Sequence, residues 1–597
     1  MFMWNDSDLN DEQVEAIEEE KSVFLVACPG SGKTRTLTYK IARELSKLKE
    51  EKKWVVAITY THRAADEIHE RIEMLGVDTS KLWIGTIHSF CLEWILKPYG
   101  IYHDSLKYGF RVINSHDTEQ KITELCLPFR NPKITVWNCG HHYTSTERVL
   151  TCSAVQRPYV ENILDQYCAN LHDNQQVDFE QILLFAYELI VQHSSISKLL
   201  SSLFSYILVD EYQDTKEIQY RIVAEIIKAG QGRVKSFIVG DPNQAIYGSL
   251  GGYAITAREF QAMANIEQRE MSLSLNYRSS NRIVEYFSHY NVYDTSISAE
   301  GEFSDFPSVI TFDTLTEKSE LVEMLTQLIR HQIEVEGVPQ NEICILAPQW
   351  IFLASMTRSL MTALPEYSFD GPGMVPFTRD IDNFWYKLTR IILSEPSPTM
   401  YVRRLRWAGE VLSSLEDANV DISSISRRML LRECNTIMLA EQDGLEYLEQ
   451  FMDQLFERLN IDYSDFPSLV EHHDAFFSSS RARIQRIQKE GTTFINTIDA
   501  FRKVFESRSG ITVSTIHGIK GGEFDVVIAY ALLQGLVPYS GNSNDSAKKL
   551  LYVIGSRARK HLHLISERGR RDAYTRTERI PTEVLNACSF DYDGERP

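Results

Sequence analysis

The stretch from residue 27 to residue 34 constrains the fold of this chain more than any other part of the sequence. It reads Ala-Cys-Pro-Gly-Ser-Gly-Lys-Thr, it follows an apolar run at 23–26 and it precedes a helix-like stretch at 35–45. A strand, a glycine-rich turn and a helix in this order are typical of a phosphate-binding loop at the edge of a parallel sheet. The sequence therefore predicts an α/β fold that binds a nucleotide.

The residues of this loop have distinct chemical roles. Backbone N–H groups around Gly30, Ser31 and Gly32 are expected to surround the phosphates at the start of the helix. Lys33 is expected to reach the β- and γ-phosphates, and the Thr34 hydroxyl to bind Mg²⁺.

A pair of carboxylates follows a second apolar run, at 207–209. Asp210 and Glu211 come where this predicted strand ends, which is the edge at which open α/β sheets bind ligands. Asp210 could hold Mg²⁺, and Glu211 could polarise a water molecule for attack on phosphate. An ordinary acidic turn is the alternative for an isolated Asp-Glu pair, and the upstream phosphate loop favours the catalytic reading.

Composition indicates an ordinary globular protein of several domains. The chain has 597 residues, 43% of them hydrophobic and 24% charged. We expect no membrane span, because no apolar run approaches about 20 residues. The N-terminus lacks the basic region of a secretory signal, and the nine cysteines are scattered, so we expect reduced thiols and a cytoplasmic location.

The net charge of −20 argues against a protein that coats nucleic acid along its whole surface. A local basic groove remains compatible with it, because binding follows local charge.

A loose cluster of cysteine and histidine raises the question of a zinc site. Structural thiols and surface histidines are the preferred interpretation, because no Cys-x-x-Cys pair is present. The cluster consists of Cys126, Cys139, His141, His142 and Cys152.

Apolar patterning divides the chain into two regions of alternating strands and helices, each interrupted by a mostly helical insertion. This alternation predicts two parallel sheets. The predicted strands are 23–26, 54–59, 82–86, 206–210, 236–240, 271–275, 343–347, 511–515 and 524–529. The clearest predicted helices are 35–45, 64–75, 160–168, 179–192, 447–459 and 494–505.

The ordered set of motifs resembles the UvrD/Rep-like superfamily 1A DNA helicases over almost the whole chain. Besides the two features above, it includes Gly-Asp-Pro-Asn-Gln at 240–244, Asn-Tyr-Arg-Ser-Ser at 276–280 and Thr-Ile-His-Gly-Ile-Lys-Gly at 515–521. The resemblance implies two RecA-like P-loop domains, 1A and 2A, with helical insertions 1B and 2B. The implied boundaries are 1–94 and 183–290 for 1A, 95–182 for 1B, 291–380 and 506–597 for 2A, and 381–505 for 2B.

The resemblance also implies roles at the ATP site. Gln13 would read the adenine edge, Tyr277 would stack on the base and Glu523 would contact the ribose. Glu211 would be the base for hydrolysis, and Asp210 and Thr34 would hold Mg²⁺. The remaining catalytic side chains would sense or stabilise the γ-phosphate, and they are Gln244, Arg278 and Arg557.

A second set of residues would contact DNA. The resemblance places them in four motifs that grip a single strand by backbone contacts and by stacking. They are Tyr60, Thr61, Thr86, His88, Tyr247, Thr515 and His517.

The function that the resemblance implies is an ATP-driven translocase that unwinds DNA, with 3′→5′ direction, acting on single-stranded or tailed duplex DNA, as in DNA repair. The alternative is a DNA-stimulated ATPase that senses DNA for a nuclease or another protein partner, as the helicase-like subunit does in the antiphage system Gabija. Ser249 and Leu250 favour this alternative, since the family has Trp-Arg there.

Overall fold

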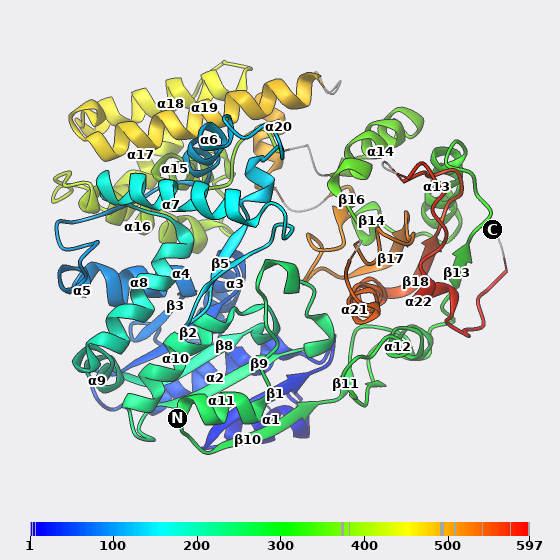
Figure 1. The fold of residues 1–597 in the computed structure, drawn as a ribbon, viewed down its shortest axis with the longest axis horizontal. Helices are drawn as coiled ribbons and strands as arrows, with labels where there is room; N and C mark the ends of the chain where they lie inside the picture. Colours follow the sequence, from blue (N-terminus) through cyan, green and yellow to red (C-terminus); the bar gives the residue numbers. More distant parts are fainter. Residues whose placement is uncertain are drawn as a thin grey trace. The chain divides into compact units, whose positions relative to one another are not determined.

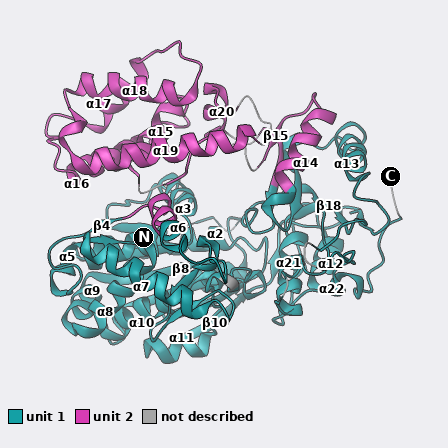
Figure 2. Cartoon of the chain, turned by 45° about the horizontal axis from the view of Figure 1, so that its top comes forward, with its two compact units in different colours: residues 1–112, 122–352, 514–597 teal, residues 113–121, 353–513 magenta. Residues whose placement is uncertain are grey.

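The fold is known from a computed structural model. It describes residues 2, 4–5, 7–371, 375–380, 383–489, 495–506, 509–539, 541–572 and 575–594, and in this range it leaves out the side chain of Ser249. The chain divides into two compact units (Figure 2). Unit 1 comprises residues 1–112, 122–352 and 514–597, and unit 2 comprises residues 113–121 and 353–513.

A six-stranded parallel sheet, here called the first sheet, organises the N-terminal half of unit 1 (Figure 1). Its strand order is β10-β1-β9-β8-β2-β3. The strands are β1 (Ser22–Ala27), β2 (Trp54–Thr59), β3 (Leu82–Thr86), β8 (Phe204–Asp210), β9 (Lys235–Gly240) and β10 (Gln268–Leu273). All its pairs are parallel, as the alternating pattern predicts.

Two apolar cores cover the faces of the first sheet, because its strands are buried on both sides. One core joins the sheet to α2 (Lys33–Lys47) and α3 (His62–Met74). The other joins it to α8 (Phe179–Gln192), α9 (Ser194–Leu203), α10 (Glu217–Ala229) and α11 (Ala257–Ala264). The helix α1 (Asp11–Glu18) precedes β1.

The second sheet lies in the C-terminal half of unit 1. Its strands there are parallel and follow the order β13-β18-β17-β14. They are β13 (Ile310–Asp313), β14 (Ile343–Ala347), β17 (Phe524–Ala529) and β18 (Ala558–Ile565). A core shared with α12 (Asn281–Ser288) and α21 (Asn544–Gly555) packs on it.

Unit 2 is mostly helical and has its own aromatic-rich core. A short parallel pair, β15 (Phe369–Asp370) and β16 (Ile511–Thr515), flanks its helices in the sequence. The helices of this core are α15 (Phe384–Leu393), α16 (Tyr401–Asp417), α17 (Arg427–Thr436), α18 (Gly444–Leu459), α19 (Pro467–Lys489) and α20 (Ile498–Lys503).

Two of the predicted elements take a different form in the structure. The predicted helix 494–505 is only α20, and Phe494 lies outside the described residues. The predicted strand 271–275 is two strands, because β10 ends at Leu273 and β11 (Leu275–Asn276) pairs with β12 (Ser298–Ala299). The break lies at Ser274, whose N–H donates to the Glu12 carboxylate at 2.8 Å.

The first insertion also contains short strands that periodicity did not predict. They form the hairpin β5 (His141–Tyr143) and β6 (Arg148–Leu150) and the pair β4 (Arg111–Val112) and β7 (Gln176–Val177). Strands of two or three residues are too short for an alternating pattern to be visible. Among the described residues, no helix is long and apolar enough to cross a membrane.

Candidate active site

The phosphate loop joins β1 to α2, and two glycines allow its tight turn. Gly30 and Gly32 have φ of +71° and +76°, a region that favours glycine. A Cβ on Gly32 would lie 2.5 Å from Nε2 of Gln13. Gln13 Nε2 in turn donates to the Ser31 carbonyl at 2.9 Å. The loop therefore packs directly against Gln13, and α2 begins immediately after it.

The carboxylate pair Asp210-Glu211, here called motif II, lies next to this loop. Asp210 ends β8 and Glu211 follows with φ of +54°, a left-handed conformation that is uncommon outside glycine. The Lys33 ammonium forms an ion pair with Glu211 and lies 3.7 Å from Oδ1 of Asp210. Gln213 donates a second hydrogen bond to Glu211. The structure thus brings together the cation and both carboxylates that the sequence analysis singles out.

Burial and the Lys33 ammonium together shift the pKa values of the two carboxylates in opposite directions. Burial raises the pKa of Asp210 to about 6, although Lys33 opposes the shift. Burial acts in the same direction on Glu211, but Lys33 and Lys520 outweigh it and lower its pKa to about 2. Glu211 is therefore ionised at neutral pH, as a general base must be.

Gln244 and Arg557 meet from opposite halves of unit 1. Gln244 follows β9 of the first sheet, and Arg557 lies between α21 and β18 of the second half. Arg557 donates from Nη2 to Oε1 of Gln244 at 2.6 Å, and Gln244 donates from Nε2 to Oδ2 of Asp241 at 2.8 Å. Burial, with Arg278 nearby, lowers the pKa of the Arg557 guanidinium to about 9.

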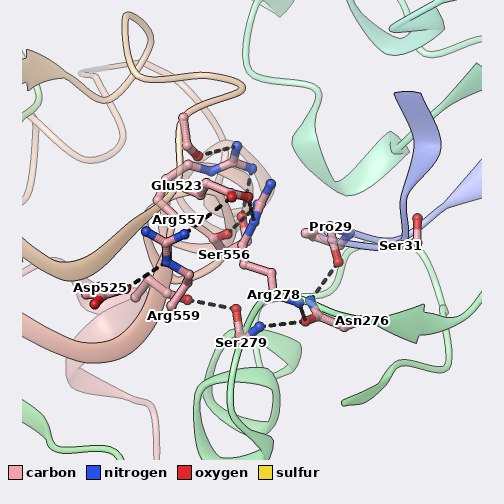
Figure 3. Close-up of polar contacts among 12 residues, drawn as sticks. Pro29, Ser31, Asn276, Arg278, Ser279, Glu523, Asp525, Ser556, Arg557 and Arg559 are labelled. Atoms are coloured by element: carbon pink, nitrogen blue, oxygen red, sulfur yellow. Dashed lines mark hydrogen bonds and ion pairs between the residues drawn. The ribbon is translucent and has the colours of Figure 1, made fainter. Parts of the chain in front are cut away.

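Arg278 and Glu523 form a second contact between the halves (Figure 3). Arg278 donates from Nε to Glu523 at 2.8 Å and from Nη1 to the Ser556 carbonyl at 2.8 Å. Asn276, which the sequence analysis missed as a site residue, connects this arginine to the phosphate loop. Its Nδ2 donates to the Pro29 carbonyl at 2.6 Å, and its Oδ1 accepts the backbone N–H of Arg278 at 2.9 Å.

The proposed base-binding side chains are linked by another residue that the sequence analysis left out. Asn10 caps α1 by accepting the N–H of Gln13 and donates from Nδ2 to the Tyr277 hydroxyl at 2.7 Å. The Tyr277 side chain is otherwise partly exposed, with 41% of its surface accessible. Its ring is therefore open to stacking while its hydroxyl is held.

The donor set fits Mg²⁺ held together with a nucleotide. Asp210 is almost fully buried at the strand end, and Thr34 lies in the first turn of α2. Mg²⁺ usually takes one or two protein oxygens and completes its shell with phosphates and water. Among the described residues, no group of three or more His, Cys, Asp or Glu side chains is arranged to hold a metal ion by itself.

Comparisons with known proteins agree with this geometry. A profile described as "UvrD/REP helicase N-terminal domain" matches residues 9–263, and one described as "UvrD-like helicase C-terminal domain" matches residues 468–569. Together they cover more than half of the chain. The chain belongs to the UvrD/Rep-like superfamily 1A helicases. It is an ATP-hydrolysing enzyme of the DNA helicase class, and its two sheets are the RecA-like domains of this family.

Individual relatives are distant but match along most of their length. The "ATP-dependent DNA helicase PcrA" of Staphylococcus epidermidis strain RP62A is 23% identical over 93% of this chain and 83% of its own. The protein of the same name from Staphylococcus aureus strain Mu50 is 22% identical over the same shares.

Three of the seven residues expected to contact DNA gather in one aromatic cluster, formed by Tyr60, Tyr247 and His517. The ring centroids of Tyr60 and Tyr247 are 5.4 Å apart, and those of Tyr247 and His517 are 5.6 Å apart. The Tyr247 hydroxyl donates to the His517 carbonyl at 2.9 Å, which ties the cluster to the second half. Tyr60 is 44% exposed, so the cluster has an open face.

The other four are placed by local backbone contacts. Thr61 and Thr86 cap helices α3 and α4 (Ile87–Cys91), and Thr515 accepts the N–H of Gly518 at 2.9 Å. The His88 ring lies 5.7 Å from that of Phe179. The structure does not bring these four into the aromatic cluster.

Lys520 is a site residue that the sequence analysis quoted in a motif but did not single out. Its ammonium pairs with Asp214, donates to the Gln244 carbonyl at 3.3 Å and lies 3.8 Å from Oε2 of Glu211. It also lies 5.6 Å from the centroid of the Tyr247 ring. The signal available in the sequence was a lysine directly before Gly521 in the motif at 515–521.

The loop where the UvrD/Rep-like family has Trp-Arg takes another form here. Leu250 is 60% exposed, and Gly251 turns the chain with φ of +89°. A Cβ on Gly251 would lie 2.8 Å from Cδ2 of His142, which belongs to the β5–β6 hairpin of the first insertion.

Two members of the loose cysteine and histidine cluster lie close together. The sulfur atoms of Cys126 and Cys139 are 3.7 Å apart, and both residues are buried.

Proposed function

We propose that this helicase-family enzyme is a translocase that moves 3′→5′ along single-stranded DNA and unwinds tailed duplexes. The observation that carries the proposal is the contact of Arg557 with Gln244, since it joins a cation of the second RecA-like domain to a polar side chain of the first. A phosphate bound at Lys33 is expected to draw on cations from both domains. Binding and hydrolysis would then change how the domains engage each other.

The roles proposed for the ATP site follow from where each group lies. Lys33 leaves the carboxylates for the β- and γ-phosphates, while Glu211 accepts the proton of the attacking water and Gln244 orients that water. Asp210 and Thr34 would hold Mg²⁺, and the ion would supply positive charge next to the phosphates. Arg278 and Arg557 stabilise charge that develops on the γ-phosphate.

Nucleotide base and ribose would be held by side chains at the edge of the same site. Gln13 and Tyr277 take the base, Glu523 takes the ribose, and Gly30, Ser31 and Gly32 present the backbone of the loop. For DNA, we propose stacking on Tyr60, Tyr247 and His517. Backbone contacts are proposed from Thr61, Thr86, His88 and Thr515.

The second candidate function is a DNA-stimulated ATPase that serves a nuclease or other partner in antiphage defence and unwinds little alone. The exposed Leu250 and the packing of Gly251 against His142 favour it, since the usual aromatic platform and arginine of this loop are missing.

One pair of assays separates the two functions. ATP hydrolysis is measured with and without oligo-dT, beside strand displacement on duplexes with a 3′ or a 5′ tail, with Lys33→Ala as the inactive control. The translocase proposal predicts DNA-stimulated hydrolysis and displacement of the 3′-tailed duplex only. Stimulated hydrolysis without displacement would support the sensor function, and displacement of the 5′-tailed duplex would overturn the direction.

A further inference from the structure

Asn276 is a fully buried side chain that contacts both the phosphate loop and the backbone of Arg278 (Figure 3). Its Nδ2 donates to the Pro29 carbonyl at 2.6 Å. Its Oδ1 accepts two backbone N–H groups, that of Arg278 at 2.9 Å and that of Ser279 at 2.8 Å. A side-chain amide is suited to this position because it carries a donor and an acceptor on one planar group. Asn276 therefore joins the loop to the segment that carries Arg278.

The backbone of the phosphate loop packs against the same segment. The Gly30 carbonyl accepts the backbone N–H of Tyr277 at 3.0 Å. A Cβ on Gly30 would lie 2.7 Å from Cβ of Arg278 and 3.0 Å from Nδ2 of Asn276, so glycine is needed for this close approach. The backbone of residues 276–278 is therefore fixed directly to the loop that is proposed to bind the phosphates.

The side chain of Arg278, in contrast, is held by the second RecA-like domain. Its Nε donates to the Glu523 carboxylate at 2.8 Å, and its Nη1 donates to the Ser556 carbonyl at 2.8 Å. The neighbouring Ser279 donates from Oγ to the Ala558 carbonyl at 2.7 Å. To reach a γ-phosphate, the guanidinium has to leave Glu523, whereas the backbone of Arg278 already lies beside the loop.

A second asparagine shows the same hydrogen bonds in a purely structural setting. Asn383, in unit 2, is also buried, and its Nδ2 donates to the His472 carbonyl at 2.7 Å. Its Oδ1 accepts the backbone N–H groups of Trp385 at 2.9 Å and Tyr386 at 3.3 Å, which caps α15. Asn276 differs from Asn383 only in what these bonds join, namely a phosphate loop and an arginine.

We propose that Asn276 is a positioning residue for ATP hydrolysis. It fixes the backbone of Arg278 to the phosphate loop, so that the arginine side chain alone has to move when nucleotide binds. This inference rests on the proposed function, since it requires Arg278 to act on the γ-phosphate. Stabilisation of developing charge depends on accurate placement, and a shift of about 1 Å can lower a rate by about 10²-fold.

The test compares ATP hydrolysis in Asn276→Ala, Arg278→Ala and the double variant, with saturating oligo-dT and Mg²⁺. Asn276→Ala should lower kcat by about 10–10²-fold. The Kd of a fluorescent ATP analogue should stay within a few-fold, because the loop backbone and Lys33 remain. If Asn276 acts through Arg278, the double variant should have the kcat of Arg278→Ala alone, since the two losses are then not independent.

Two further variants separate positioning from folding. Asn383→Ala removes the same three hydrogen bonds and should lower the Tm while leaving kcat unchanged. Asn276→Ser keeps a short acceptor for the turn but does not reach Pro29. It should lower kcat in the same non-additive way, and it tests the link to the loop even where Asn276→Ala does not fold.

Each outcome has a defined meaning. A kcat within a few-fold of normal in Asn276→Ser overturns the inference, and so do losses that multiply in the double variants of Asn276 and Arg278. A normal kcat in Arg278→Ala instead overturns the role proposed for Arg278, on which the inference rests. An unmodified protein that hydrolyses no ATP overturns the proposed function itself.

Discussion

At the scale of single residues, Glu211 combines a strained backbone conformation with a carboxylate that is held in its ionised form. Its left-handed φ costs a non-glycine residue about 1–2 kcal/mol, and strain of this kind persists where the surroundings hold it in place. Here the Glu211 carboxylate is held by its ion pair with Lys33, the first residue of α2 after the phosphate loop, and by the hydrogen bond from Gln213.

Substituting Glu211 tests its role as base. Glu211→Gln keeps the shape but removes the proton acceptor, so we expect turnover to fall by at least about 10²-fold. Nucleotide binding, measured with a fluorescent ATP analogue, should persist because Lys33 remains. Glu225→Gln, in an exposed ion pair on α10, is the matched control. Turnover within a few-fold of normal in Glu211→Gln would rule out the assignment.

Arg278 offers a second test at this scale. If it stabilises charge on the γ-phosphate, Arg278→Ala should lower kcat by about 10³–10⁵-fold and change KM little. Arg282→Ala is the control, four residues further along the chain, since Arg282 pairs with Asp593. Weakened nucleotide binding at unchanged kcat would contradict the arginine-finger role.

At the scale of elements, the turn between β1 and α2 decides whether phosphate can be bound. Gly32 is the N-cap of α2 and has the φ of a left-handed residue, so a side chain here meets both backbone strain and Gln13. Gly76, after α3, has a similar φ of +71°, but a Cβ there would meet nothing within 4 Å.

Comparing alanine variants of Gly32 and Gly76 separates the effect of backbone strain from the effect of a side chain that contacts Gln13. Gly76→Ala should cost about 1 kcal/mol of stability and leave ATP hydrolysis intact. Gly32→Ala carries the same strain and also pushes on Gln13, so we expect it to lose nucleotide binding. Thermal unfolding and titration with a fluorescent ATP analogue measure the two effects. Equal nucleotide affinity in both variants would show that the contact with Gln13 is unimportant.

The elements also show where sequence patterns reach their limit. The phosphate loop, motif II and most strands were predictable, because each depends on residues adjacent in the chain. The break at Ser274 was not, since it depends on the Glu12 carboxylate, more than 200 residues away. Asn10, Asn276 and Lys520 were missed for the same reason, because their partners are remote in sequence.

At the scale of the whole molecule, acid stability depends on buried histidines as well as on the net charge of −20. His563 in β18 is buried, with its ring hydrogen-bonded to the Thr311 hydroxyl at 2.9 Å. Burial lowers the pKa of this histidine to about 3. In the unfolded chain this histidine is expected to bind a proton with a pKa near 6.5, whereas in the folded chain it stays neutral until much lower pH. The free energy of unfolding therefore decreases as the pH falls below about 6.5.

A variant of His563 separates its contribution to the pH dependence of stability from the contributions of the many carboxylates that also titrate. At pH 5.5, His563 should account for about 1.4 kcal/mol of destabilisation relative to neutral pH. His563→Gln should lose correspondingly less stability between pH 7.5 and pH 5.5, measured by chemical unfolding at both values. An identical loss in the variant and the unmodified protein would mean that His563 is protonated in the folded state.

By itself, the sequence determined the class of fold and the chemistry of the phosphate site, because a phosphate loop and a carboxylate pair at strand ends are local patterns with few other uses. Only the tertiary structure decided which groups of the two RecA-like domains meet. Arg557 reaches Gln244, Arg278 reaches Glu523, and Lys520 faces both Asp214 and Tyr247. Such contacts depend on how two sheets pack, and packing joins residues that no spacing along the chain relates.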